Sequence, residues 1–156
     1  MRYRLYLDTS VLGAVCDPGP ADRLKATRRL FQRAERKELA VYISTLAIEE
    51  LSAAPEEVQV KVRAVIESVR PEILIETDES QELADYYVET AVFPERCSID
   101  ARHVAIATVY ALDALVPWNY RHMVNLQKRQ RISGANLMHG FKPIDIVTPG
   151  EMTEDA

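Results

Sequence analysis

The chain has 156 residues, 47% of them hydrophobic and 28% charged, a balance typical of one soluble globular domain and not of a disordered chain. Its net charge of −5 argues against a nucleic-acid partner, because phosphate binding depends on Lys and Arg, although the distribution of the charges weakens that objection. The two cysteines, Cys16 and Cys97, have no metal-ligand spacing, so neither a disulfide framework nor a zinc site is predicted.

The first third of the chain predicts two strands, each followed by a helix. Side chains alternate over residues 3–7, which favours a strand that ends at Asp8. Apolar residues then recur at helical spacing over residues 21–38, with basic residues on the outer face. Residues 41–44 form a second short strand that leads directly into a helical pattern over residues 45–53.

The middle of the chain continues the same alternation. Valine and isoleucine recur at helical spacing over residues 58–69, and residues 73–75 form a third strand. Asp78 followed by Gln81 resembles a capping box, which would open a helix that runs through Ala91.

Ser98 is predicted to cap a helix over residues 99–112. That helix is apolar on nearly every side and is therefore expected to be buried. Residues 114–116 follow as a fourth strand, which Pro117 ends.

The last third predicts a helix over residues 121–131, a polar loop over residues 133–140 and a fifth strand over residues 144–147. Strands that alternate with helices imply right-handed crossovers and a parallel sheet covered on both faces. We therefore expect an α/β fold: a three-layer α/β/α sandwich with a mostly parallel sheet of about five strands. Residues 1–148 would form one domain, and residues 149–156 a short acidic tail.

Acidic and polar side chains fall where the predicted strands end. Asp8 ends the first strand, Glu49 and Glu50 follow the second, Asp100 opens the helix before the fourth, and Asn119 follows the fourth. Because reacting groups in open α/β sheets collect at the carboxyl ends of the strands, these side chains are expected to converge. One of Glu49 and Glu50 must face solvent, since neighbours on a helix point in different directions.

Converging carboxylates repel one another, and a shared cation relieves that repulsion. Oxygen ligands without His or Cys favour Mg²⁺ or Mn²⁺ over Zn²⁺. Each residue taken alone also has an ordinary structural explanation, which stays open at this point. Asp8 and Asn119 are common turn residues, and Asp100 complements the dipole of its helix.

Charge is segregated along the chain. Residues 21–37 carry seven bases against two acids, residues 121–131 carry four bases and no acid, and residues 76–90 carry six acids and no base. The basic segments are either solvated helix faces or contacts for a polyanion.

Four short motifs, in this order, resemble the PIN domain of VapC-type toxins. They are Tyr6 to Leu12, Ile43 to Leu51, Asp100 to Ala107 and Leu115 to Asn119, and together they span nearly the whole chain. The resemblance implies three acidic site residues at Asp8, Glu50 and Asp100, with Glu49 as the reserve for Glu50. Asn119 departs from the pattern, because many members carry Asp at that position, and this puts a full two-metal site in doubt.

The resemblance further implies an Mg²⁺- or Mn²⁺-dependent endoribonuclease, with control by an antitoxin and dimerisation common in the family. Asp8 and Asp100 would hold the cation, supported by Thr9 and Ser10. Glu50 would be a further metal ligand, orient water held by the cation, or act as general base, while Asn119 would hold a water or a phosphate oxygen. The basic residues assigned to RNA backbone are Arg29, Arg33 and Arg121.

Other interpretations of the same residues remain. A haloacid dehalogenase needs a second Asp at the position of Ser10, and a phosphoacceptor receiver domain fits the third strand poorly. An inactive nuclease fold that only binds RNA or a protein is the strongest competitor, with Asn119 in its favour. Trp118 is predicted to pack beside the fourth strand and His103 to be a hydrogen-bonded core residue; stacking of a base on Trp118 is the alternative.

The sequence predicts a cytoplasmic protein without membrane attachment. Residues 1–8 lack the basic and long apolar regions of a signal peptide. The longest apolar stretch, Val104 to Leu112, is far shorter than the roughly 20 residues that a membrane-spanning helix needs.

Overall fold

The computed structural model describes residues 2–16, 19–118 and 125–153. Within these ranges five strands form a single sheet in the order β3-β2-β1-β4-β5, and every pairing is parallel. The strands are β1 (Arg4–Leu7), β2 (Ala40–Ser44), β3 (Glu72–Leu74), β4 (Ala114–Val116) and β5 (Asp145–Ile146). The predicted α/β class with about five parallel strands is confirmed.

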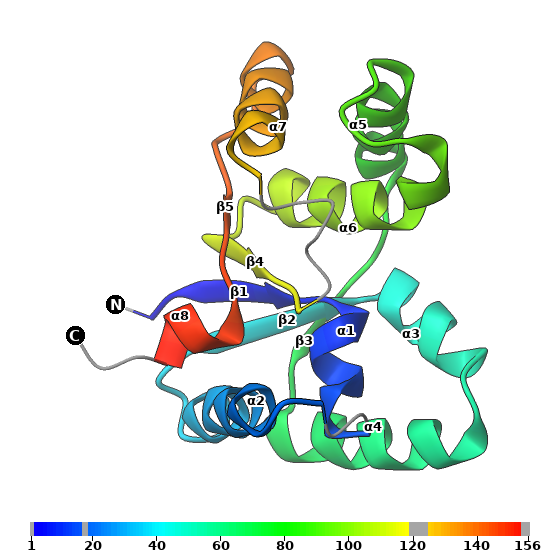
Figure 1. The fold of residues 1–156 in the computed structure, drawn as a ribbon. Helices are drawn as coiled ribbons and strands as arrows, with labels where there is room; N and C mark the ends of the chain where they lie inside the picture. The colour runs from blue at the N-terminus through cyan, green and yellow to red at the C-terminus, as the bar shows by residue number, and fades with distance from the viewer. Residues whose placement is uncertain (1, 17–18, 119–124, 154–156) are drawn as a thin grey trace.

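Helices cover both faces of the sheet (Figure 1). One face carries α5, α6 and α7, and the opposite face carries α1, α2 and α4, while α3 lies at the end of the sheet where β2 ends. The helices are α1 (Thr9–Leu12), α2 (Ala21–Glu35), α3 (Thr45–Ser52), α4 (Glu56–Val69), α5 (Asp78–Glu89), α6 (Ser98–Val109), α7 (Leu126–Met138) and α8 (Pro149–Thr153), with 3₁₀ turns η1 (Gly13–Val15) and η2 (Glu95–Cys97).

Alternation along the strands divides the core into two layers. Leu5 and Leu7 of β1 point to the layer formed with α2 and α4, whereas Tyr6 between them points to the layer formed with α5 and α6. All three side chains are fully buried, because parallel strands covered on both faces have no solvent-facing side. This places the Tyr6 hydroxyl under α6, next to the carboxyl end of the sheet.

Helix α6 is buried on almost every side, as its apolar sequence predicts. Seven of its residues are buried: Ala101, His103, Val104, Ala105, Ile106, Ala107 and Thr108. Its start differs from the prediction, because Ser98 is its first residue and not its cap, and the turn η2 leads into it.

The predicted loop over residues 133–140 is wrong. Helix α7 continues through it to Met138, and Asn125 caps the helix by accepting from the Lys128 amide at 2.7 Å. Gly134 suggested a break, but one turn of the helix buries Ile132, Ala135 and Asn136 against the core. Burial of that stripe outweighs the cost of one helical glycine, about 1 kcal/mol.

Two helix ends also lie elsewhere than predicted. Helix α5 is capped by a capping box one residue earlier, between Thr77 and Ser80 and not Asp78 and Gln81. Helix α2 ends at Glu35, because Lys37 adopts a left-handed conformation with φ of 60° that turns the chain toward β2. The predicted acidic tail begins as helix α8, which packs against α2.

Within the part of the chain that the structure describes, no helix is long and apolar enough to cross a membrane.

Candidate metal and nuclease site

Asp8 follows β1 at the carboxyl edge of the sheet, and its carboxylate is only 4% exposed. It is the N-cap of α1: Oδ1 accepts from the Ser10 amide at 3.0 Å, the Ser10 hydroxyl at 2.6 Å and the Val11 amide at 3.3 Å. Asp8 therefore does have the ordinary structural role, at the turn after its strand, that the sequence left open. Three donors on one oxygen also fix the direction of the carboxylate.

Burial raises the pKa of Asp8 to about 6, although His103 and the donors of α1 act in the opposite direction. The negative charge of Asp100 raises it further. Asp8 and Asp100, separated by most of the chain, are thus close enough to repel each other. That repulsion is the one expected between two carboxylates that share a cation.

Glu50 and Glu49 separate as helix geometry requires, with Glu50 turned toward Asp8 and Glu49 exposed. Oε1 of Glu50 accepts from the Thr9 hydroxyl at 2.7 Å and lies 2.6 Å from Nε2 of His103. Partial burial by itself would raise the pKa of Glu50, but the contacts with His103 and Thr9 outweigh it, and the pKa is lowered. Glu50 is therefore held as a carboxylate.

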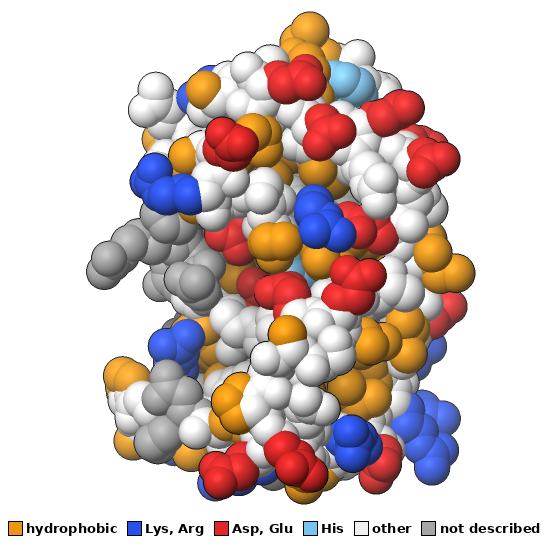
Figure 2. Space-filling model, turned by 90° about the vertical axis from the view of Figure 1, so that its right-hand side faces the viewer, with side chains coloured by type: hydrophobic (Ala, Val, Ile, Leu, Met, Phe, Trp, Pro, Cys, Tyr) orange, Lys and Arg blue, Asp and Glu red, His pale blue; other side chains and the backbone are white. Residues whose placement is uncertain are grey.

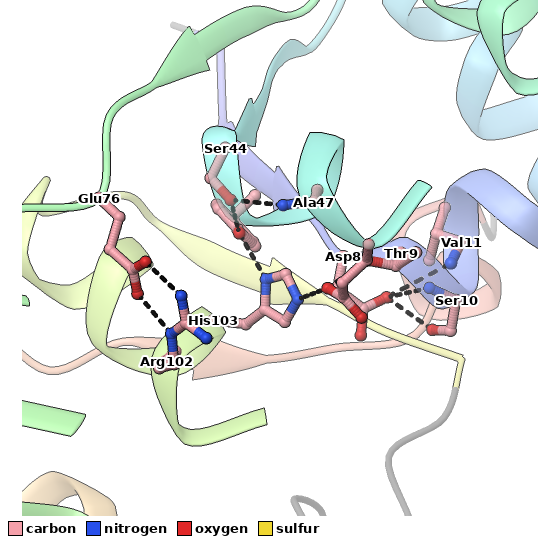
Figure 3. A network of polar contacts seen from close by, with 11 residues as sticks. Asp8, Thr9, Ser10, Val11, Ser44, Ala47, Glu76, Arg102 and His103 are labelled. Atoms are coloured by element: carbon pink, nitrogen blue, oxygen red, sulfur yellow. Dashed lines mark hydrogen bonds and ion pairs between the residues drawn. The ribbon is translucent and has the colours of Figure 1, made fainter. Parts of the chain in front are cut away.

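A buried polar network stands behind Glu50 (Figure 3). His103 is 2% exposed, and its Nδ1 lies 2.5 Å from the Tyr6 hydroxyl. That hydroxyl lies 2.6 Å from Oγ of Ser44, which accepts from the Ala47 amide at 3.2 Å. The prediction of His103 as a hydrogen-bonded core residue is confirmed.

The network ends on a donor to Glu50. An ionised carboxylate can only accept, so Nε2 of His103 donates to Oε1 of Glu50. Nδ1 of the same ring is joined through the Tyr6 hydroxyl to Ser44, and these contacts fix the orientation of the ring. The network therefore holds the Glu50 carboxylate in one position.

Arg102 lies beside this network but is already paired. Its Nε and Nη2 donate to the two carboxylate oxygens of Glu76 at 2.8 and 2.6 Å. The bidentate pair lowers the pKa of Glu76. Arg102 therefore contributes positive charge near Glu50 while two of its five N–H groups donate to Glu76 (Figure 3).

Trp118 follows β4 and is anchored to the same edge. Its amide donates to the Ser10 hydroxyl at 2.8 Å, and its indole Nε1 donates to Thr27 of α2 at 2.7 Å. Arg23, at the start of α2, lies over the indole ring with its guanidinium carbon 5.0 Å from the ring centre. Trp118 thus packs beside its strand as predicted, and it also links α2 to the Asp8 site.

The donor set at this edge fits a hard divalent cation. No group of three His, Cys, Asp or Glu side chains among residues 2–16, 19–118 and 125–153 is arranged to hold a metal alone. Mg²⁺ does not require such a group, because it keeps several waters and takes one or two carboxylates together with phosphate oxygens. Asp8 and Asp100 are two carboxylates near enough at this edge to affect each other's ionisation.

The remaining predicted residues fall into two groups. Asn119 and Arg121 lie outside the described residues. Arg33 is committed elsewhere: it donates to Glu38 at 3.1 Å and to the Met152 carbonyl at 2.6 Å. Because the end of α2 leads into the start of β2, Arg33 lies at the sheet edge opposite Asp8, which contradicts its assignment to the site. Arg29, one turn earlier, is exposed.

The sequence analysis identified the acidic residues of the site but missed the residues that hold them in place. Tyr6 is the residue before the last of β1 and Ser44 is the last residue of β2, and a polar side chain near the end of a buried strand was the available signal. Arg23 was recognised only as one of seven bases. Nothing in its local sequence distinguishes it, because its contact with Trp118 joins residues far apart in the chain.

Comparison with known proteins identifies the fold. The sequence matches no protein-family model and no curated protein. Its structure is similar to that of Mycobacterium tuberculosis VapC20, a toxin that cleaves the sarcin-ricin loop, with TM-score 0.58 and 18% identity over 76% of this chain and 92% of VapC20. It is also similar to a chain of Rickettsia felis VapBC2, solved with a DNA fragment of its promoter, with TM-score 0.59 and 14% identity over 93% of this chain and 98% of that one. The predicted resemblance is confirmed at the level of the fold.

Proposed function

On the premise that this chain has the fold of VapC-type PIN-domain toxins, we propose that it is a metal-dependent endoribonuclease. One observation supports this most directly. Carboxylates from three distant segments, Asp8, Glu50 and Asp100, gather at one edge of a parallel sheet, where burial and, to a smaller extent, the charge of Asp100 raise the pKa of Asp8. Perturbed carboxylates that come together at the carboxyl ends of parallel strands are typical of a functional site.

Asp8 and Asp100 are the residues that hold Mg²⁺ or Mn²⁺. When bound, the cation supplies positive charge for the phosphate and makes water a better nucleophile. Asp8 serves well in this role because the donors of α1 fix one of its oxygens and thereby orient the other. Ser10 supports Asp8 and Thr9 supports Glu50, each through its hydroxyl.

Glu50 orients the attacking water and accepts its proton. Its Oε1 is held by His103 and Thr9, which leaves Oε2 to face the reacting groups. Because its pKa is lowered, Glu50 is ionised at neutral pH and able to act as a base. The fixed direction of Oε2 is what the buried network behind it provides.

The proposed setting is a toxin–antitoxin pair in the cytoplasm. VapBC2 of Rickettsia felis was solved on a DNA fragment of its promoter, and VapC20 is a toxin that cleaves the sarcin-ricin loop. By analogy with these proteins, an antitoxin that covers the acidic edge and a homodimer are the expected partners of this chain.

Cleavage of mixed RNA by the purified chain tests the proposal. We expect Mn²⁺-dependent cleavage by the wild type, loss of cleavage in Asp8→Asn and Asp100→Asn, and full cleavage in Glu49→Gln, which removes an exposed charge one residue from Glu50. Equal cleavage by all four proteins would contradict the proposal. No cleavage by any, with RNA still bound, would identify the chain as an inactive binding module.

A further inference from the structure

Arg23 and Trp118 form a rigid unit beside the acidic edge. The Arg23 guanidinium lies on the Trp118 ring, and Thr27 joins the two by accepting from the indole and donating to the Arg23 carbonyl at 2.8 Å. Trp118 is tied in turn to Ser10, which donates to Asp8. The ring on which the Arg23 guanidinium lies is therefore held relative to Asp8 by the hydrogen bonds of Trp118 to Thr27 and Ser10.

The charge of Arg23 has no partner in the described parts of the chain. Its Nε is buried without a hydrogen-bond partner, which is rare for a buried polar atom. The indole face accounts for Nε, since a guanidinium that stacks on an aromatic ring is attracted by the ring electrons. Arg23 is partly exposed, and within the described residues its terminal nitrogens make no hydrogen bond or ion pair.

The surroundings limit what can bind there. Asp8, Glu50 and Asp100 make the edge negative, and Arg102 forms an ion pair with Glu76. On the face shown in Figure 2, acidic side chains dominate the upper part over α5, which would repel a polyanion. The exposed acids of α5 are Asp78, Glu79, Glu82, Asp85 and Glu89. A polyanionic substrate therefore needs a positive group at the side of the site near α2.

We propose that Arg23, held in place by Trp118, binds a phosphate of the RNA strand next to the one that is cleaved. The inference rests on the proposed nuclease function and names a substrate contact of that site. A guanidinium whose flat face is occupied by indole still presents its outer edge, and that edge matches two phosphate oxygens. Stacking also lowers the entropy that the side chain loses on binding, because its orientation is already fixed.

Salt dependence of RNA binding tests the inference. Each phosphate contact with a single strand contributes about −0.7 to the slope of log K against log[salt]. In an Asp100→Asn background that prevents cleavage, we expect Arg23→Gln to reduce the steepness of that slope by about 0.7 for a fluorescent single-stranded RNA. Trp118→Leu should weaken RNA binding and reduce the slope in the same direction as Arg23→Gln. Arg23→Lys should keep most of the slope.

Lys25→Gln is the matched control. It removes the same charge from an exposed side chain of α2, and two residues along a helix point to nearly opposite sides. We expect its slope to equal that of the parent protein. Equal slopes for Arg23→Gln and Lys25→Gln, or the absence of RNA binding by the parent, would overturn the inference.

Two further outcomes separate the claims. In the first, the salt-dependence slope depends on Arg23 and yet the wild type never cleaves RNA with Mn²⁺. That result would overturn the nuclease proposal and support the phosphate contact. Cleavage of RNA by the wild type, together with an unchanged salt-dependence slope in Arg23→Gln, would support the nuclease proposal and overturn the phosphate contact. If Arg23→Gln weakens binding of an acidic peptide but not of RNA, the occupant is a protein and the inference fails.

Discussion

The two edges of the sheet handle charge in opposite ways. At the carboxyl edge Asp8 and His103 are 4% and 2% exposed, and their partners reach them from distant segments. At the amino edge Arg33 and Glu38 form an ion pair whose side chains are 38% and 46% exposed. Solvent screens the second pair, whereas burial strengthens every interaction in the first set and also makes its charges costly.

This difference separates function from stability. An exposed ion pair contributes about 0–1 kcal/mol and can be lost with little consequence. The Asp8 carboxylate instead costs folding energy, because its pKa is raised by burial and by Asp100. The fold therefore tolerates an energetically costly buried charge at the carboxyl edge, where the catalytic site is proposed. The contacts at the amino edge are weak and replaceable.

The largest expected effect comes from Asp8→Asn. Asparagine can still cap α1, so the fold should persist while RNA cleavage falls by about a hundredfold to a thousandfold. In chelator at pH 7 the variant should be more stable than wild type by up to about 3 kcal/mol, since each unit of raised pKa is about 1.4 kcal/mol. Urea unfolding measures this, and a less stable variant would contradict the assignment of a buried, strained charge.

The same strain predicts a pH dependence. Because the folded pKa of Asp8 is about 6 and its ordinary value is 3.8, the folded protein holds this proton more tightly than the unfolded chain. The penalty is full above pH 6 and disappears as the pH falls to about 4. The wild type in chelator should thus approach the stability of Asp8→Asn over this window. A constant gap between the two proteins from pH 4 to 7 would show that Asp8 is not the cause.

Changes in the network behind Glu50 should have a smaller effect. His103→Ala leaves the Tyr6 hydroxyl and Glu50 without a partner, so unfolding should become easier by about 1–3 kcal/mol and kcat should fall about tenfold. KM should change little, because the network orients Glu50 and does not contact RNA. His103→Gln retains a donor and should recover part of kcat. A fall in KM alone, or equal kcat in both variants, would rule out positioning.

The smallest effect is expected at the amino edge. Glu38→Ala breaks the exposed pair with Arg33, and the free energy of unfolding should change by less than about 1 kcal/mol. Cleavage should be unchanged. Thermal unfolding and the RNA assay would check both, and a loss of activity here would mean that the two edges are coupled.

The sequence predicted the local features of this protein better than its long-range ones. The strand over residues 114–116 was located correctly, because a short apolar run ended by proline has few alternatives. The loop predicted over residues 133–140 failed, since burial of Ile132 and Asn136 depends on packing that no local pattern contains. Helix geometry could say that only one of Glu49 and Glu50 faces the site, and the contacts of Thr9 and His103 decide for Glu50.

Binding of Mn²⁺ tests the central claim most directly, because it needs neither the right RNA nor a partner. We expect the wild type to bind Mn²⁺ in a calorimetric titration, and Asp8→Asn and Asp100→Asn each to weaken binding at least about tenfold. Glu49→Gln should bind as the wild type does. Equal affinity in all four proteins, or loss of affinity in Glu49→Gln alone, would contradict a cation held between Asp8 and Asp100.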